Sequence, residues 1–341
     1  MTNLAATFTD ELLEEACLEK ASDIHFYPLP NEGKTYIYFR ILGKRKLIRS
    51  IHKSVYQMVL TYLKFSSAMD IGEIRLPQNG TLPFESKNNQ TYSLRLSTLP
   101  LKESESMTIR LLPQEEELAL DQLFLFPAQS RKMKSWLTKP SGIILFTGPT
   151  GCGKTTTMYA LLEAMLEERS FQAITLEDPI EKKLNDVLQV EVNESAGITY
   201  QAGLKAALRH DPDVLLIGEI RDRQTAEFAF RASLTGHLVL STLHAKDAKG
   251  TIERLIDLGI DRRLISQTLI AVAAIQLLPI KKKGKTDSRA AIVELLDENV
   301  LKRTIHGEEH AMHHYHSFNY LREKAYLYGF ISKEVYEGTI F

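Results

Sequence analysis

The stretch GPTGCGKTT, residues 148–156, constrains the fold of this 341-residue chain more than any other segment. It fits the pattern G-x-x-x-x-G-K-[ST] through Gly148, Gly153, Lys154 and Thr155. The apolar segment GIILFT precedes it and a helical pattern follows it. Glycines let consecutive backbone N–H groups face one anion, and a helix start adds the positive end of its dipole. The context predicts a strand, a phosphate-binding loop and a helix.

This loop predicts a site for a nucleoside triphosphate and its metal. The Lys154 ammonium is expected to bridge the β- and γ-phosphates, and the Thr155 hydroxyl to hold Mg²⁺. We therefore expect ATP and Mg²⁺ as cofactors. The expected nucleotide-binding residues are Gly148, Pro149, Thr150, Gly151, Cys152, Gly153, Lys154, Thr155 and Thr156.

The segments around the loop alternate between buried apolar strands and helices. Strands are expected at 142–147, 173–178, 214–220 and 237–244. Helices are expected at 155–168, 201–209, 224–234, 248–258 and 262–277. This alternation predicts a mostly parallel sheet covered on both faces.

The first third of the chain predicts a smaller α/β domain, residues 1–113. Helices are expected at 11–20 and 55–64, and strands at 23–26, 35–41, 90–98 and 106–112. An acidic run flanked by prolines predicts a linker at 114–127. The nucleotide-binding domain then takes residues 128–341, with a polar helical part from His306 onward.

Three further motifs place charged side chains at strand ends. LEDPIE carries Glu177, LRHDPDVLLIGEIRD carries Glu219, and TGHLVLSTLHA carries His244. The carboxyl ends of parallel strands face the crevice where such sheets bind ligands. Taken alone, LEDPIE could be a solvated acidic turn and His244 a structural histidine.

Together, the four motifs resemble the Walker A, Asp box, extended Walker B and His box of the secretion-superfamily ATPases. These are the motors of type II secretion, type IV pili and competence pili. SDIHF, RLPQNG and LRLSTLP in the first third are similar to the same family. The resemblance implies a RecA-like P-loop ATPase domain preceded by a smaller PAS-like α/β domain. It also implies a hexameric ring, with nucleotide between the two domains.

The resemblance also assigns roles to single residues. Glu177 would be the general base that orients the attacking water, Glu219 would hold Mg²⁺ through water, and His244 would contact the γ-phosphate. Arg95 and Arg110 would reach the phosphates, or be surface arginines of two strands. Gly218-Glu219 stands where many P-loop enzymes have Asp-Glu. The base could therefore be Glu177 or Glu219, and we favour Glu177.

Many assembly motors carry a four-cysteine zinc motif after a QRL sequence. The equivalent stretch here, IQLLPIKKKGK, has no cysteine, and the whole chain has two, Cys17 and Cys152. We expect no zinc. A short zinc-free chain looks like the Gram-positive competence pseudopilus assembly ATPases. The implied partners are other copies of the chain and a polytopic membrane platform protein, with the pilin contacted only indirectly. A retraction or type II secretion motor is the alternative.

Two other function classes are considered, a nucleic-acid motor and a regulatory or scaffold protein. A net charge of −1 and the absence of an aromatic–basic stacking surface argue against a RecA-like nucleic-acid motor, so no direct nucleic-acid partner is expected. A nucleotide-gated regulatory or scaffold protein is the remaining alternative. No targeting segment is visible, and the longest apolar run, Leu269–Ile280, is shorter than a membrane-spanning helix. We expect a cytoplasmic protein, peripheral at the inner face of the cell membrane.

Two weaker features leave alternatives open. Lys154 and the helix start could lower the pKa of Cys152 and make it oxidisable, or Cys152 could be a tolerated small residue. His306, His310 and His314 share a helical face with His313 close by; they could bind a metal or form a polar surface.

Overall fold

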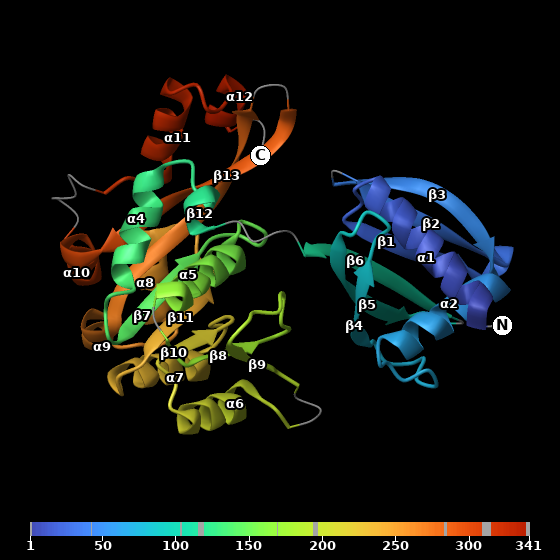
Figure 1. Ribbon diagram of the computed structural model, residues 1–341, viewed down its shortest axis with the longest axis horizontal. Coiled ribbons are helices and arrows are strands. Elements are labelled where there is room, and N and C mark those ends of the chain that lie inside the picture. The colour runs from blue at the N-terminus through green and yellow to red at the C-terminus, as the bar shows by residue number, and fades with distance from the viewer. Residues whose placement is uncertain are drawn as a thin grey trace. The chain divides into compact units, whose positions relative to one another are not determined.

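The computed structural model divides the chain into two compact units, Met1–Glu116 and Glu117–Phe341 (Figure 1). It describes residues 2–41, 43–102, 104–114, 119–168, 170–193, 197–282, 285–308 and 315–338. Each unit has its own sheet and its own hydrophobic core. The two units are therefore described separately.

The first unit is an antiparallel sheet with two helices, in the strand order β3-β2-β1-β6-β5-β4. The strands are β1 (Asp23–Leu29), β2 (Lys34–Ile41), β3 (Lys44–His52), β4 (Asn79–Glu85), β5 (Thr91–Pro100) and β6 (Glu105–Gln114). The helices are α1 (Thr2–Leu18), α2 (Lys53–Ser66) and the single turn η1 (Pro30–Glu32).

Alternation along the central strands puts one face of this sheet against the helices. On β1, Ile24 and Phe26 enter the same core as Leu13 of α1 and Leu63 of α2. Successive side chains of a strand point to opposite faces, so Asp23 lies on the other face. The strands predicted from this alternation are confirmed.

Two strands of the first unit, β3 and β4, were not predicted, and they lie at the edges of its sheet. Most side chains of β3 are exposed, and its sequence KRKLIRSIH is basic rather than apolar. In β4, Pro83 interrupts the strand pattern. Lysines and prolines are typical of edge strands because they discourage pairing with other chains. The same residues interrupt the alternating apolar pattern from which strands are predicted.

The second unit is built on one sheet in the order β13-β12-β7-β11-β10-β8-β9. Its strands are β7 (Gly142–Thr147), β8 (Ala173–Glu177), β9 (Val187–Glu191), β10 (Val214–Ile217), β11 (Leu238–Leu243), β12 (Leu269–Lys282) and β13 (Lys285–Asp297). All neighbouring pairs are parallel except β12 and β13. The predicted mostly parallel sheet is confirmed.

Helices cover both faces of this sheet, and each face has its own core (Figure 1). One core includes residues of α6 (Tyr200–Ala207), α7 (Arg223–Leu234), α8 (Ala248–Asp257), α9 (Arg262–Thr268) and α10 (Glu298–His306). The other includes residues of α3 (Leu120–Leu123), α4 (Pro127–Trp136) and α5 (Lys154–Glu168). The turn η3 (Leu208–His210) follows α6, and α11 (Phe318–Leu327) and α12 (Lys333–Tyr336) are the last described helices.

The helix predicted at 262–277 is wrong beyond its first half. Helix α9 ends at Thr268, and the apolar run that follows is strand β12. β12 lies between β7 and β13, where both faces are covered, and Val272, Ala273 and Ala274 are fully buried. A continuous apolar run fits a fully buried strand and a buried helix equally well, so periodicity alone does not separate them. Within the described residues, no helix is long and apolar enough to cross a membrane.

The segment predicted as a linker, 114–127, contributes to the second unit. Part of it forms α3, and the Leu120 side chain is buried in the core beside α5. The remaining domain limits and the PAS-like character of the first unit stay predictions.

Candidate active site

The phosphate-binding loop connects β7 to α5, as the sequence predicts. Gly148 has a φ of 139° and Gly153 a φ of 93°, conformations that other residues rarely adopt. A Cβ atom on Gly148 would lie 2.6 Å from the backbone oxygen of Ile275 in β12. The loop therefore needs glycine for its backbone conformation and for its close approach to the neighbouring strand.

Lys154 lies at the start of α5 with its side chain folded back over the loop. Its ammonium donates hydrogen bonds to the backbone oxygens of Gly148 at 2.9 Å and Pro149 at 3.0 Å. The residue is 9% exposed. A buried cation beside the backbone N–H groups of a helix start is suited to binding phosphate. All nine predicted loop residues lie on this loop and the first turn of α5.

The sheet topology brings the three remaining motifs to the same edge. β11 lies between β7 and β10, and β8 follows β10, all in parallel. His244 follows β11, Glu219 lies just beyond β10, and Glu177 is the last residue of β8. Their strands therefore end next to the phosphate loop in the order His244, Glu219, Glu177.

A threonine hydroxyl connects the loop strand to the histidine strand. Thr147, the last residue of β7, donates its hydroxyl to the backbone oxygen of Leu243 at 2.8 Å. The same hydroxyl accepts the N–H of Ala245 at 3.0 Å. These bonds flank His244 in sequence, so its backbone is fixed relative to the phosphate loop.

Glu177 is buried and held by neutral hydrogen-bond donors. Thr175 donates to Oε1 at 2.7 Å, Gln189 of β9 donates to the same atom at 3.3 Å, and Tyr159 of α5 donates to Oε2. Burial and the nearby Glu177 charge raise the pKa of Tyr159, so this phenol keeps its proton at neutral pH. The contact joins the helix after the phosphate loop to Glu177.

Glu219 lies in a charged cluster. Its Oε1 is 3.1 Å from Nε2 of His244, and its Oε2 accepts a hydrogen bond from Nε of Arg221 at 2.9 Å. Arg221 also donates from Nη1 to Asp178 at 3.1 Å. Glu219 and His244 are thus in direct contact, and Arg221 connects them to the residue after Glu177.

Burial raises the pKa of Tyr200 of α6 to about 12, with Asp178 adding to the shift. The phenol therefore stays neutral beside this acidic cluster.

Four residues that contact Glu177 or Glu219 were not predicted as site residues: Tyr159, Thr175, Gln189 and Arg221. Arg221 lies two residues from Glu219, and Thr175 two residues from Glu177. This closeness in sequence could have indicated the contacts. Tyr159 and Gln189 reach Glu177 only because helix α5 and strand β9 pack beside β8.

Arg95 and Arg110 lie in the first unit, on neighbouring strands β5 and β6, where they oppose each other in register. Nε of Arg110 donates to Asp23 at 2.9 Å. Although burial opposes the effect, hydrogen bonds from Arg110 and Ser22 lower the pKa of Asp23. The two arginines form a pair on one face of their sheet, and their contact with phosphates stays a prediction.

Of the two interpretations of Cys152, the structure favours the tolerated small residue over the oxidisable thiol. Burial raises the pKa of the Cys152 thiol, and this outweighs the opposite effect of Lys154. The residue is 5% exposed and packs into the core beside α5. A buried thiol that holds its proton is a poor nucleophile.

The predicted histidine stripe falls mostly outside the described residues, which include His306 but not His310, His313 or His314. Within the described part of the chain, no group of three or more histidine, cysteine or carboxylate side chains is placed to hold a metal ion.

The donors near the loop can be compared with what Mg²⁺ requires. Mg²⁺ usually keeps several waters and takes few direct protein ligands. The Thr155 hydroxyl on the first turn of α5 and the partly exposed Glu219 carboxylate are oxygen donors of this kind. The donor set fits a hydrated magnesium ion accompanying a nucleotide.

Comparison with known proteins identifies the family. The family model described as "Type II/IV secretion system protein" matches residues 2–327. The chain belongs to this family. Its members are ATPases of secretion machinery, so the predicted enzyme class and nucleotide binding are confirmed.

Within this family, the relatives include a competence protein and a type II secretion protein. The chain is 42% identical to competence protein ComGA of Bacillus subtilis (strain 168), covering 97% of this chain and 96% of that protein. It is 41% identical to type II secretion system protein E of Pseudomonas aeruginosa over 79% of this chain and 53% of that protein.

A solved structure supports the fold. The structure of the pilus retraction motor PilT with bound ADP covers 97% of this chain and 96% of that chain, with a TM-score of 0.76 and 28% identity. The predicted α/β class with a RecA-like P-loop core is confirmed.

Proposed function

We propose that this secretion ATPase powers assembly of a competence pseudopilus for DNA uptake. The observation that carries the proposal is similarity to competence protein ComGA over nearly the full length of both chains. The phosphate loop and the edge formed by His244, Glu219 and Glu177 supply the chemistry that such a motor needs.

The arrangement supports distinct roles for the two glutamates. Both carboxylate oxygens of Glu177 accept hydrogen bonds from neutral donors, which leaves its negative charge without a cationic partner among the described contacts. Glu219 contacts Arg221 and His244. We assign the proton-accepting role to Glu177 and the orientation of hydrated Mg²⁺ to Glu219, with Thr155 as the direct ligand.

His244 is proposed to respond to the γ-phosphate. It follows the strand next to β7 and contacts Glu219, while the adjacent residues share hydrogen bonds with Thr147. A shift at the loop would therefore reach His244 and Glu219 together. Arg95 and Arg110 would stabilise the charge that develops on the phosphates during transfer.

The assembly is proposed to be a hexameric ring in the cytoplasm, held at the inner face of the membrane by a polytopic platform protein. Pilin would be contacted only through that protein. Closure on nucleotide and reopening after hydrolysis would supply the movement.

The test of this proposal is natural transformation in the source cell. Replacing the chromosomal copy with Lys154→Ala should abolish DNA uptake, because the cation that binds the phosphates is lost. Protein abundance measured by immunoblot should be unchanged. Wild-type transformation in the variant strain would contradict the proposal.

Similarity to PilT favours one alternative, a motor that retracts pili. The same variant separates the two possibilities. Loss of an assembly motor leaves cells without surface fibres, whereas loss of a retraction motor leaves fibres that accumulate. Electron microscopy of Lys154→Ala cells therefore decides between them.

A further inference from the structure

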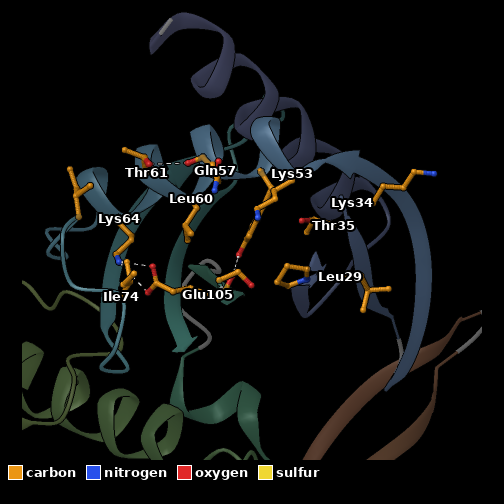
Figure 2. A pocket seen from close by; sticks show the side chains of 14 residues that line it. Leu29, Lys34, Thr35, Lys53, Gln57, Leu60, Thr61, Lys64, Ile74 and Glu105 are labelled. Atoms are coloured by element: carbon orange, nitrogen blue, oxygen red, sulfur yellow. Dashed lines mark hydrogen bonds and ion pairs between the residues drawn. The ribbon is translucent and has the colours of Figure 1, made fainter. Parts of the chain in front are cut away.

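The first unit contains a cavity of about 390 Å³ that has no part in the nucleotide site. One side of it is formed by α2, and the opposite side by the end of β1, the start of β2 and the start of β6 (Figure 2). All of its lining residues belong to the first unit. Cavities of this size are typical of small-molecule sites.

The base of the cavity is a buried ion pair between Lys64 and Glu105. The ammonium of Lys64 contacts both oxygens of Glu105, at 2.9 and 3.1 Å, and donates to the backbone oxygen of Glu73 at 2.6 Å. Tyr56 donates its hydroxyl to the backbone oxygen of Glu105 at 2.8 Å. The three N–H donors of Lys64 and the hydroxyl donor of Tyr56 are therefore all used within the protein, and the donors for a ligand must come from other residues of the lining.

Two other polar groups in the wall have no hydrogen-bond partner among the residues that the structure describes. The Thr35 side chain is fully buried, and within the described part of the chain neither its hydroxyl nor the buried hydroxyl of Ser104 makes a hydrogen bond. Both residues line the cavity, and the Thr35 hydroxyl is turned toward its interior (Figure 2). Buried hydroxyls are almost always paired, because leaving one unpaired costs free energy. A ligand oxygen would satisfy them.

The lining is also positively charged, with three lysines against one glutamate. Lys64 is neutralised by Glu105. Among the described residues, neither Lys34 nor Lys53 forms an ion pair with a carboxylate. Lys53 is half-buried on the first turn of α2, whereas Lys34 is exposed and points away from the other labelled side chains (Figure 2). Lys53 is therefore the cation best placed to meet a bound anion.

Most of the remaining wall is apolar and includes Leu29, Leu60 and Ile74, with the polar side chains of Gln57 and Thr61 on the α2 side. A ligand that fits the whole lining has an apolar body, one negatively charged end and oxygen atoms able to bond hydroxyls. We propose that the first unit binds a small, soluble organic anion of this kind, a carboxylate or a phosphate monoester. Lys53 pairs with the charged end, and Thr35 donates a hydrogen bond to the ligand.

The proposal is tested with octanoate, octyl phosphate and the uncharged octan-1-ol, titrated into the full-length protein by calorimetry. Both anions should bind saturably at one site, and more tightly than octan-1-ol. Lys53→Gln should weaken both by about tenfold, because a charge-assisted bond is lost. Lys44→Gln makes the same charge change on an exposed residue that does not line the cavity, and should leave binding unchanged.

Thr35→Val distinguishes a ligand site from a packing defect. The variant removes the unpaired hydroxyl without changing the side-chain shape, so the ligand-free protein should melt at the same or a higher temperature. If the hydroxyl serves a ligand, the same variant should bind octanoate several-fold more weakly. Unchanged anion binding in Lys53→Gln or Thr35→Val would overturn the proposal. So would binding of octan-1-ol as tight as that of the two anions.

Discussion

At the residue scale, the site depends on how Glu177 is held. The motif LEDPIE predicts that a carboxylate stands at this strand end, but it gives no sign of what contacts it. Tyr159 and Gln189 lie 18 and 12 residues away in sequence and reach Glu177 through tertiary packing. Phosphate-loop residues could be predicted because their geometry is local, whereas these partners could not.

Tyr159→Phe tests the role of this contact. Removing the hydroxyl leaves a buried carboxylate short of one donor and free to turn from its position. The kcat for ATP hydrolysis should fall roughly tenfold while KM for ATP stays close to wild type, because phosphate binding is not touched. Steady-state kinetics and a thermal melt measure this. An unchanged kcat would show that the tyrosine only fills space.

Cys152 gives a second residue-scale prediction. Because burial raises the pKa of its thiol, little thiolate exists at neutral pH. Millimolar peroxide at pH 7 should leave ATPase activity nearly intact, with the same fractional loss in Cys152→Ser. A loss of activity confined to the wild-type protein would contradict this account of the thiol.

At the scale of elements, the short buried strands were the easiest to predict, and the exposed edge strands and the long buried strand β12 were the hardest. β7, β8, β10 and β11 are short apolar runs between helices, which is typical of a parallel sheet. β3 and β4 lack an apolar pattern because they are edge strands. β12 looked helical because its alanines and leucines are buried on both sides.

The pair formed by Lys64 and Glu105 connects α2 to β6 and supports a prediction about the first unit. Both side chains are buried, with 2% and 3% exposure. Lys64→Met leaves the Glu105 charge unpaired and should destabilise the protein by about 3–5 kcal/mol.

The matched control for this substitution is the double variant Lys64→Met with Glu105→Leu. It removes both charges and should recover most of that loss, since no buried charge remains. Urea unfolding followed by circular dichroism compares the three proteins. Equal destabilisation in the single and double variants would show that the ion pair is not what holds these elements together.

At the scale of the whole molecule, the family, the RecA-like core and the ATPase class could be predicted because four motifs converge on one sheet edge. Whether Arg95 and Arg110 contact the phosphates could not be predicted in this way. They lie on a sheet of their own in the first unit, and sequence motifs carry no information about how one unit meets another. If the site is completed by a neighbouring copy of the chain, activity must depend on assembly.

The central claim is tested most directly by Mg²⁺-dependent phosphate release from ATP, measured across a range of protein concentrations beside Lys154→Ala. The account predicts that activity per molecule rises with protein concentration and is absent in the variant. Phosphate release that is equal in wild type and Lys154→Ala at every concentration would contradict it.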